Sequence, residues 1–197
     1  MKRIVLASNN AGKLREFSEM LGRRDLELLA QSAFNIPEAE EPHGTFVENA
    51  LAKARHAARL TGLPALADDS GLCVAALGGE PGVHSARYAG EPKSDRRNNE
   101  KLVAALAGQS DRRAHYVAVL VLVRHADDPQ PVITEGEWQG EIVDTARGDG
   151  GFGYDAHFLL PDLGLTAAQL PAAEKHSRSH RGIALHHLVE RLDIALL

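Results

Sequence analysis

The sequence predicts an α/β fold in which helices flank a mixed central sheet. Short apolar segments alternate with segments of helical periodicity along the whole chain. Residues 115–123, HYVAVLVLV, are apolar on both faces, which is typical of a central strand. Residues 132–143 instead alternate polar and apolar side chains, as in an antiparallel strand with one wet face. No repeat or long polar linker interrupts the 197 residues, so we expect one domain, residues 1–197.

The first elements follow from the spacing of apolar residues. The apolar run at residues 3–7 predicts a buried strand, and residues 26–30 predict a second. Between them, Leu14, Phe17 and Leu21 lie on one stripe of a predicted helix.

The clearest predicted helix covers residues 45–61. Thr45 and Glu48 have the spacing of a capping box at its start. Its predicted apolar face is made of Val47, Ala50, Leu51, Ala54 and Ala58. Residues 64–67 then read as a strand that ends at two adjacent aspartates.

The second half of the chain continues the alternation. Residues 78–94 are rich in glycine and proline and predict a loop, and residues 97–107 predict a helix. The segment GDGGFGYD predicts another loop, and a last helix is expected to start near Ser179. The inward positions of the two helices are Leu102, Val103 and Leu106, and Leu185, Leu188, Val189 and Leu192.

Composition excludes several classes of function. A formal net charge of −5 argues against binding a nucleic-acid polymer, although a small anion needs only a local basic cluster. The single cysteine, Cys73, allows no disulfide within the chain and reads as a small core residue. No apolar run is long enough to span a membrane, so we expect a cytoplasmic protein.

The first candidate site is SNNAGK, residues 8–13, between a predicted strand and a predicted helix. Backbone N–H groups at a helix start favour an anion, and Lys13 adds a full positive charge. A P-loop would need glycine at position 7 and Ser or Thr at position 14, where this chain has Ala7 and Leu14. The alternative is an ordinary Asn-rich turn with a surface lysine.

The second candidate is the pair Asp68 and Asp69, together with an acidic run that contains Glu38, Glu40 and Glu41. Mg²⁺ prefers oxygen ligands and often takes only one or two protein carboxylates plus substrate phosphates. In extended backbone the two aspartates point to opposite sides, so they can have different roles. The alternative is a solvated turn in which aspartate caps neighbouring N–H groups.

Two further candidates lie near the C-terminus. The segment GGFGYDAHF, residues 150–158, could present an aromatic face to a nucleobase, or its aromatic residues could anchor a glycine turn in the core. The segment EKHSRSHRGIAL, residues 174–185, places basic side chains before and within a helix start, where they oppose the helix dipole. That conflict favours an anionic ligand, although arginines are usually solvated.

Six motifs in this order closely resemble the inosine triphosphate pyrophosphatase family, also called dITP/XTP pyrophosphatases. They are LASNNAGK, TFVENALAKA, ADDSGL, GVHSARYAG, GGFGYD and SHRGIAL, and they cover nearly the whole chain. The resemblance implies a two-lobed fold with the substrate cleft between the lobes, a Mg²⁺ cofactor and a homodimer. The chain departs from the family pattern at Ala156, where proline is usual. It also departs at HSR, residues 176–178, where the family usually carries asparagine and an apolar residue.

The resemblance also implies roles for residues. Asp69 would be the general base and a Mg²⁺ ligand, with Glu40 as the second metal contact and Glu41 as the less certain neighbour. Lys53 and Asp68 would support the phosphate site. Substrate contacts would come from Ser8, Asn9, Asn10, Ala11, Gly12, Lys13, Ser70, Phe152, Gly153, Tyr154, Asp155, Lys175, His180 and Arg181.

The expected reaction is hydrolysis of ITP, dITP or XTP to a monophosphate and pyrophosphate. Water would attack the α-phosphorus while Asp69 orients or deprotonates it. Donors from His180 and Arg181 would favour a purine with a carbonyl at its six-position over adenine, which carries an amino group there. The alternatives are a nucleotide-binding regulatory module without turnover and a pyrophosphatase for another nucleotide.

Overall fold

The computed structural model describes residues 2–21 and 26–195, and it contains a seven-stranded sheet in the order β2-β1-β3-β4-β5-β6-β7. The strands are β1 (Lys2–Leu6), β2 (Leu26–Ala30), β3 (Ala65–Val74), β4 (Arg113–Val123), β5 (Val132–Ile142), β6 (Phe158–Leu160) and β7 (Leu165–Thr166). The helices are α1 (Ala11–Leu21), α2 (Phe46–Thr61), α3 (Asp95–Ala105), α4 (Ala172–Arg178) and α5 (His180–Ala195). Short 3₁₀ helices are η1 (Gln31–Phe34), η2 (Ala75–Leu77), η3 (Gly82–Arg87) and η4 (Ala167–Gln169). The mixed sheet with flanking helices confirms the predicted fold class.

The chain divides into two compact units, which we describe separately. The first unit contains residues 1–69, 118–136 and 183–197, and the second contains residues 70–117 and 137–182. Strands β3, β4 and β5 each contribute residues to both units. The predicted single domain, residues 1–197, stays a prediction.

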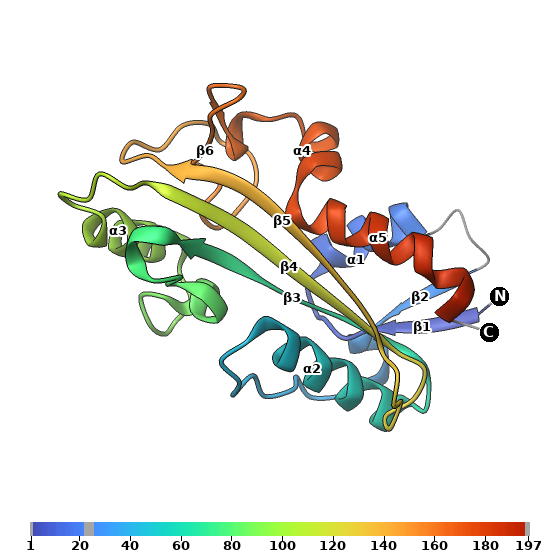
Figure 1. Cartoon of the computed structure of the whole chain (residues 1–197). Coiled ribbons are helices and arrows are strands. Elements are labelled where there is room, and N and C mark those ends of the chain that lie inside the picture. The colour runs from blue at the N-terminus through green and yellow to red at the C-terminus, as the bar shows by residue number, and fades with distance from the viewer. Residues whose placement is uncertain (1, 22–25, 196–197) are drawn as a thin grey trace. The chain divides into compact units, whose positions relative to one another are not determined.

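In the first unit, β1 pairs in parallel with β2 and with β3. Helices α1 and α5 cover one side of these strands, and α2 covers the other (Figure 1). The core on the α1 and α5 side consists of Ile4, Leu6, Phe17, Leu21, Leu66, Ala118, Leu120, Leu122, Ala184, Leu185, Leu188 and Leu192. On the other side, α2 buries small residues, Ala50, Ala54, Ala57 and Ala58. Small side chains let this helix lie close to the strands, which brings its polar neighbours to the sheet.

In the second unit, the core contains an aromatic group that the first unit lacks among its described buried residues. Tyr116, Trp138 and Phe158 contact one another through their rings, with centroid separations between 4.6 and 6.5 Å. Strand β6 pairs antiparallel with both β5 and β7. These strands carry the glycine-rich loop 148–157 between β5 and β6.

Most predicted elements are confirmed within two residues at each end. Thr45 caps α2, because its hydroxyl accepts from the Glu48 backbone N–H and donates to the Glu48 carboxylate at 2.5 Å. Val47 was placed on the apolar face but is exposed, and Ala57 is buried instead. The strand predicted at residues 64–67 is also too short, because β3 continues to Val74. The two aspartates therefore lie inside a strand and not at its end.

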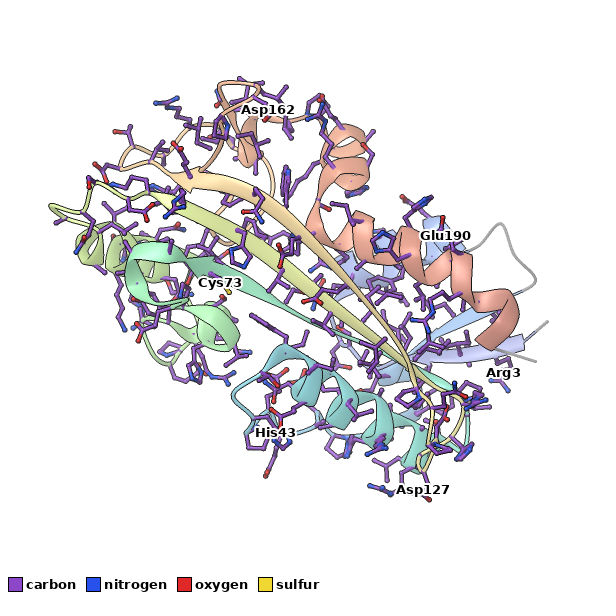
Figure 2. The ribbon with its side chains drawn as sticks, in the orientation of Figure 1. Arg3, His43, Cys73, Asp127, Asp162 and Glu190 are labelled. Atoms are coloured by element: carbon purple, nitrogen blue, oxygen red, sulfur yellow. The ribbon has the colours of Figure 1, made fainter. Side chains whose placement is uncertain are left out.

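The lone cysteine is a structural residue of β3 (Figure 2). Cys73 is half-buried, and burial, followed by the nearby charge of Glu137, raises the pKa of its thiol. The thiol is therefore protonated at neutral pH, which gives no support to a nucleophilic role.

Candidate active site

The turn at residues 8–13 is a capped helix start. The side-chain oxygen of Asn10 accepts from the backbone N–H groups of Gly12 at 2.8 Å and Lys13 at 3.1 Å. The Ser8 hydroxyl accepts from the Asn10 N–H, and the Asn9 side chain donates to Glu38. Asn10 thus satisfies two of the free N–H groups of α1, as an Asn-rich turn before a helix can.

Lys13 is not the surface lysine of that alternative. Its ammonium group lies 2.8 Å from Asp68, whose side chain is fully buried, while the Lys13 side chain is 22% exposed. One face of Lys13 is thus committed to a buried carboxylate and the other is open to a ligand. The pair joins the start of α1 to β3 within the first unit.

Asp69, the next residue on β3, makes a separate cluster with α2. Lys53 lies 2.8 Å from both the Asp69 carboxylate and the Glu41 carboxylate. The second oxygen of Asp69, Oδ2, is buried and has no hydrogen-bond partner among the described residues. The two aspartates face opposite sides of the strand, as the sequence predicts, so that Asp68 meets Lys13 and Asp69 meets Lys53. The two lysine partners themselves were not predicted.

This cluster holds two carboxylates and one ammonium group, so its net charge is negative. Burial raises the pKa of Asp69, and the Lys53 charge only partly opposes this, while Glu41 and Asp68 add to it. The pKa of Lys53 is also raised, because burial is outweighed by the attraction of its two carboxylate partners. The cluster therefore keeps Lys53 charged and makes Asp69 harder to ionise unless another cation is near.

A Mg²⁺ ion fits these residues chemically. A buried carboxylate oxygen without a partner, next to an excess of negative charge, is a donor that a hard cation would satisfy. Among residues 2–21 and 26–195, no group of three or more His, Cys, Asp or Glu side chains could hold a metal alone. That agrees with an ion bound through one or two carboxylates plus substrate phosphates.

Two glutamates of the acidic run, Glu40 and Glu41, differ in burial and in their contacts with the Asp69 cluster. Glu41 is half-buried and bonded to Lys53, whereas Glu40 is exposed. The geometry favours Glu41 as the neighbour of Asp69, and the role of Glu40 as a metal contact stays a prediction.

The basic residues of the second unit are held at the start of α5. His180 and Arg181 are both buried, and the Arg181 guanidinium donates to the Ser70 hydroxyl at 3.4 Å. The Ser179 hydroxyl caps the helix by accepting from the Gly182 N–H at 3.2 Å. A side chain at position 182 would collide with the His176 carbonyl oxygen, so only glycine fits there.

The glycine-rich loop presents one aromatic residue and buries the other. Phe152 is 63% exposed, whereas Tyr154 is buried and donates its hydroxyl to the Ser85 carbonyl oxygen at 2.8 Å. Asp155 accepts from the Phe152 N–H and forms an ion pair with Lys175. The Lys175 ammonium group lies 4.9 Å from the Phe152 ring centroid, within the range of a cation–π contact. Tyr154 is therefore anchored in the core, as the second interpretation predicts, whereas stacking of a nucleobase on the exposed Phe152 stays a prediction.

Several supporting residues were not predicted from sequence. In α3, the Asp95 carboxylate accepts from the Gly153 N–H at 2.7 Å, and the Asn99 side chain donates to the Gly153 carbonyl at 2.8 Å. Tyr116 stacks on His180 with 4.8 Å between ring centroids. The sequence signal that could have pointed to Tyr116 was its hydroxyl within the apolar run HYVAVLVLV, because a buried tyrosine needs a polar partner.

The structure therefore forms two groups of candidate residues, one in each unit. The first-unit group is Ser8, Asn9, Asn10, Gly12, Lys13, Glu41, Lys53, Asp68 and Asp69. The second-unit group is Ser70, Phe152, Gly153, Tyr154, Asp155, Lys175, His180 and Arg181. Ala11 begins α1, but its side chain lies outside the part of the chain that the structure describes. No described helix is both long enough and apolar enough to cross a membrane.

Comparison with known proteins gives a consistent result. The model of the Ham1 family matches residues 4–191. The dITP/XTP pyrophosphatase of Ralstonia nicotianae is 68% identical, with 98% of each chain covered. The dITP/XTP pyrophosphatase of Nitrosomonas europaea is 65% identical, covering 98% of this chain and 95% of its own.

Solved structures agree with these sequence matches. A HAM1 protein from Coxiella burnetii is 49% identical, with a TM-score of 0.96 over 99% of this chain and all of its own. The Ham1 protein of Staphylococcus aureus is 42% identical, with a TM-score of 0.90 over 98% of each chain. Both identities are high enough to carry more than a shared fold.

Proposed function

This chain belongs to the Ham1 family, and on that premise we propose that it hydrolyses ITP, dITP and XTP to the monophosphate and pyrophosphate. The names of the two bacterial relatives, both dITP/XTP pyrophosphatases, support the substrate class. The residues that the family resemblance predicted are present, and they fall into one charged group and one aromatic group. Mg²⁺ is proposed as the cofactor because of the excess negative charge around Asp69.

One observation carries the proposal. Asp69 is a buried carboxylate with one oxygen bonded to Lys53 and the other without a partner among the described residues. Because an ionised carboxylate oxygen has two lone pairs, this Oδ2 can accept from a water in a fixed direction, as a general base needs, and still contact a cation. Its raised pKa also brings its proton affinity closer to that of a useful base.

In the proposed mechanism, water attacks the α-phosphorus of the nucleotide. Asp69 accepts the water proton, a bond forms between the water oxygen and the phosphorus, and the bond to the bridging oxygen breaks, so that pyrophosphate leaves. Lys13 and Lys53 counter the charge of the phosphate oxygens. Asp69 and Glu41, together with substrate phosphates, would hold a Mg²⁺ ion, which would supply positive charge near the phosphate oxygens.

The second-unit group is proposed to bind the base. The exposed Phe152 ring offers a stacking surface, while His180 and Arg181 supply donors to a purine carbonyl. Adenine would place an amino donor against these donors, and an unmatched buried polar group is costly. The group thus favours inosine and xanthosine nucleotides over adenosine nucleotides.

A nucleotide panel tests the proposal. The protein is mixed with ITP, dITP, XTP, ATP, GTP or dUTP, with and without Mg²⁺, and both pyrophosphate and orthophosphate are measured. We expect pyrophosphate from the first three substrates, far faster than from ATP or GTP, and only with the metal present. Orthophosphate as the first product, or tight nucleotide binding without any turnover, would contradict it.

From the family resemblance we further propose a cytoplasmic homodimer that binds no nucleic-acid polymer. Light scattering measures the mass in solution, where a monomer of 21.2 kDa at all concentrations would contradict the dimer.

A further inference from the structure

Tyr116 stacks on one of the predicted base-binding residues, His180, and lies near a second, Asp155. It belongs to β4, is 8% exposed, and stacks nearly parallel to the His180 ring, with an interplanar angle of 10° and centroids 4.8 Å apart. On other sides its ring packs against Phe158 at 4.6 Å and Trp138 at 6.5 Å. All four rings belong to the second unit, so this arrangement is internal to one compact body.

The Tyr116 hydroxyl reaches the glycine-rich loop. It lies near enough to the Asp155 carboxylate for that charge to act on the phenol. Burial raises the pKa of this phenol well above its usual value, and the charge of Asp155 raises it further. The phenol is therefore neutral at physiological pH and can only donate to Asp155, because an ionised carboxylate is purely an acceptor.

One side chain therefore touches two segments that are distant in the sequence. The face of the Tyr116 ring supports His180 at the start of α5. Its hydroxyl lies near Asp155, which in turn pairs with Lys175 and accepts from the Phe152 N–H.

We propose that Tyr116 is a positioning residue for purine recognition, which fixes the His180 ring and the Asp155–Lys175 pair in one arrangement. This inference rests on the proposed function. A donor that is rotated away from the six-position carbonyl loses its hydrogen bond to inosine and no longer penalises adenine. Tyr116 then acts on selectivity without touching the nucleotide, and its role is separate from the chemistry at Asp69.

The variant Tyr116→Phe tests the hydroxyl while keeping the ring. Tyr88→Phe is the matched control, because Tyr88 also belongs to the second unit and donates its hydroxyl to an exposed carboxylate, Glu80. For Tyr116→Phe we expect KM for ITP to rise about tenfold, since hydrogen bonds to charged groups are worth about that much. We expect kcat for ITP to stay within about twofold, and the ratio of kcat/KM for ITP over ATP to fall about tenfold. Tyr88→Phe should match the wild type in all three quantities.

Two results would overturn the inference alone. One is an active wild type with a folded Tyr116→Phe whose selectivity is unchanged. The other is a uniform loss of rate for ITP and ATP that follows a fall in Tm, as a purely structural role would give. A wild type that releases no pyrophosphate from ITP would instead overturn the proposed function, and this inference with it.

The stacking can also be measured without a variant. In the wild type, the His180 ring protons should resonate upfield of those of the exposed His176, because they lie over the Tyr116 ring face. This keeps the inference testable if Tyr116→Phe fails to fold. A His180 resonance at the same position as that of His176 would overturn it.

Discussion

The first-unit group is joined by charge, whereas the second-unit group is joined largely by rings and hydrogen bonds to neutral partners. In the first unit, Lys13 and Lys53 each contact a buried aspartate at 2.8 Å. In the second unit, one ion pair, between Lys175 and Asp155, lies among the exposed ring of Phe152 and the stacked pair of Tyr116 and His180. The difference matches the two parts of a nucleotide, since phosphates are polyanions and bases are flat.

From this difference we expect the first-unit group to control the rate of hydrolysis and the second-unit group to control the choice of substrate. Every nucleoside triphosphate carries the same phosphates, so changes in the first-unit group should alter turnover of all substrates alike. The bases differ in their polar edges, so changes in the second-unit group should alter affinity or selectivity. Each prediction below would sharpen this division or break it.

The largest effect is expected for Asp69→Asn. The amide cannot accept the water proton, so turnover of every substrate should fall by about 10²–10⁴-fold, the usual contribution of a general base. Pyrophosphate release measures this, and circular dichroism checks that the fold is intact. Asp127→Asn is the control, because Asp127 is 90% exposed and belongs to the loop after β4 (Figure 2). Full activity in a folded Asp69→Asn protein would end the assigned role.

The next effect is expected for Phe152→Ala. Stacking of a base on an aromatic ring is worth about 1–3 kcal/mol, so KM should rise roughly tenfold or more. Since every base has a flat face, KM for ITP and ATP should rise together, unlike the selective loss in Tyr116→Phe. The ring is 63% exposed, so Tm should change little. A KM that changes for only one nucleotide would show that Phe152 reads base identity.

The smallest effect is a shift in pH dependence for Lys53→Met. The base must be ionised, so the rate falls as the pH drops through the pKa of Asp69. Burial already raises that pKa, and Lys53 opposes the rise. Removing Lys53 leaves burial and the Glu41 charge unopposed, so the acid limb of kcat/KM should move to higher pH. A limb that stays in place or moves to lower pH would contradict the assignment of that limb to Asp69.

Much of the first unit was predictable because its signals are local. The continuous apolar run of β1, the alanine face of α2 and the Thr45 cap each depend on residues close in sequence. The opposite directions of Asp68 and Asp69 also follow from strand geometry alone.

The extent of β3 was not predictable in the same way. Two adjacent aspartates read as the end of a strand, because unpaired charges are rarely buried. Lys13 and Lys53 compensate them from two helices that are distant in the sequence, and the strand therefore continues to Val74.

The second unit offered weaker signals. Helix α4 was missed because none of its seven residues is buried, so it has no apolar periodicity. Strands β6 and β7, of three and two residues, are shorter than any periodicity can reveal. The contacts of Tyr116 depend on residues 154–155 and 180, and no local pattern connects segments so far apart.

Because Asp68 and Asp69 face opposite sides of the sheet, the number of residues in β3 before them matters. Inserting or deleting one residue in β3 just before the pair would move each aspartate to the other face of the sheet. The aspartate facing α2 would then point toward α1, away from Lys53, and its neighbour would lose Lys13. Homologues that differ in length should therefore vary in the loops and keep the residue count of this strand unchanged up to Asp69.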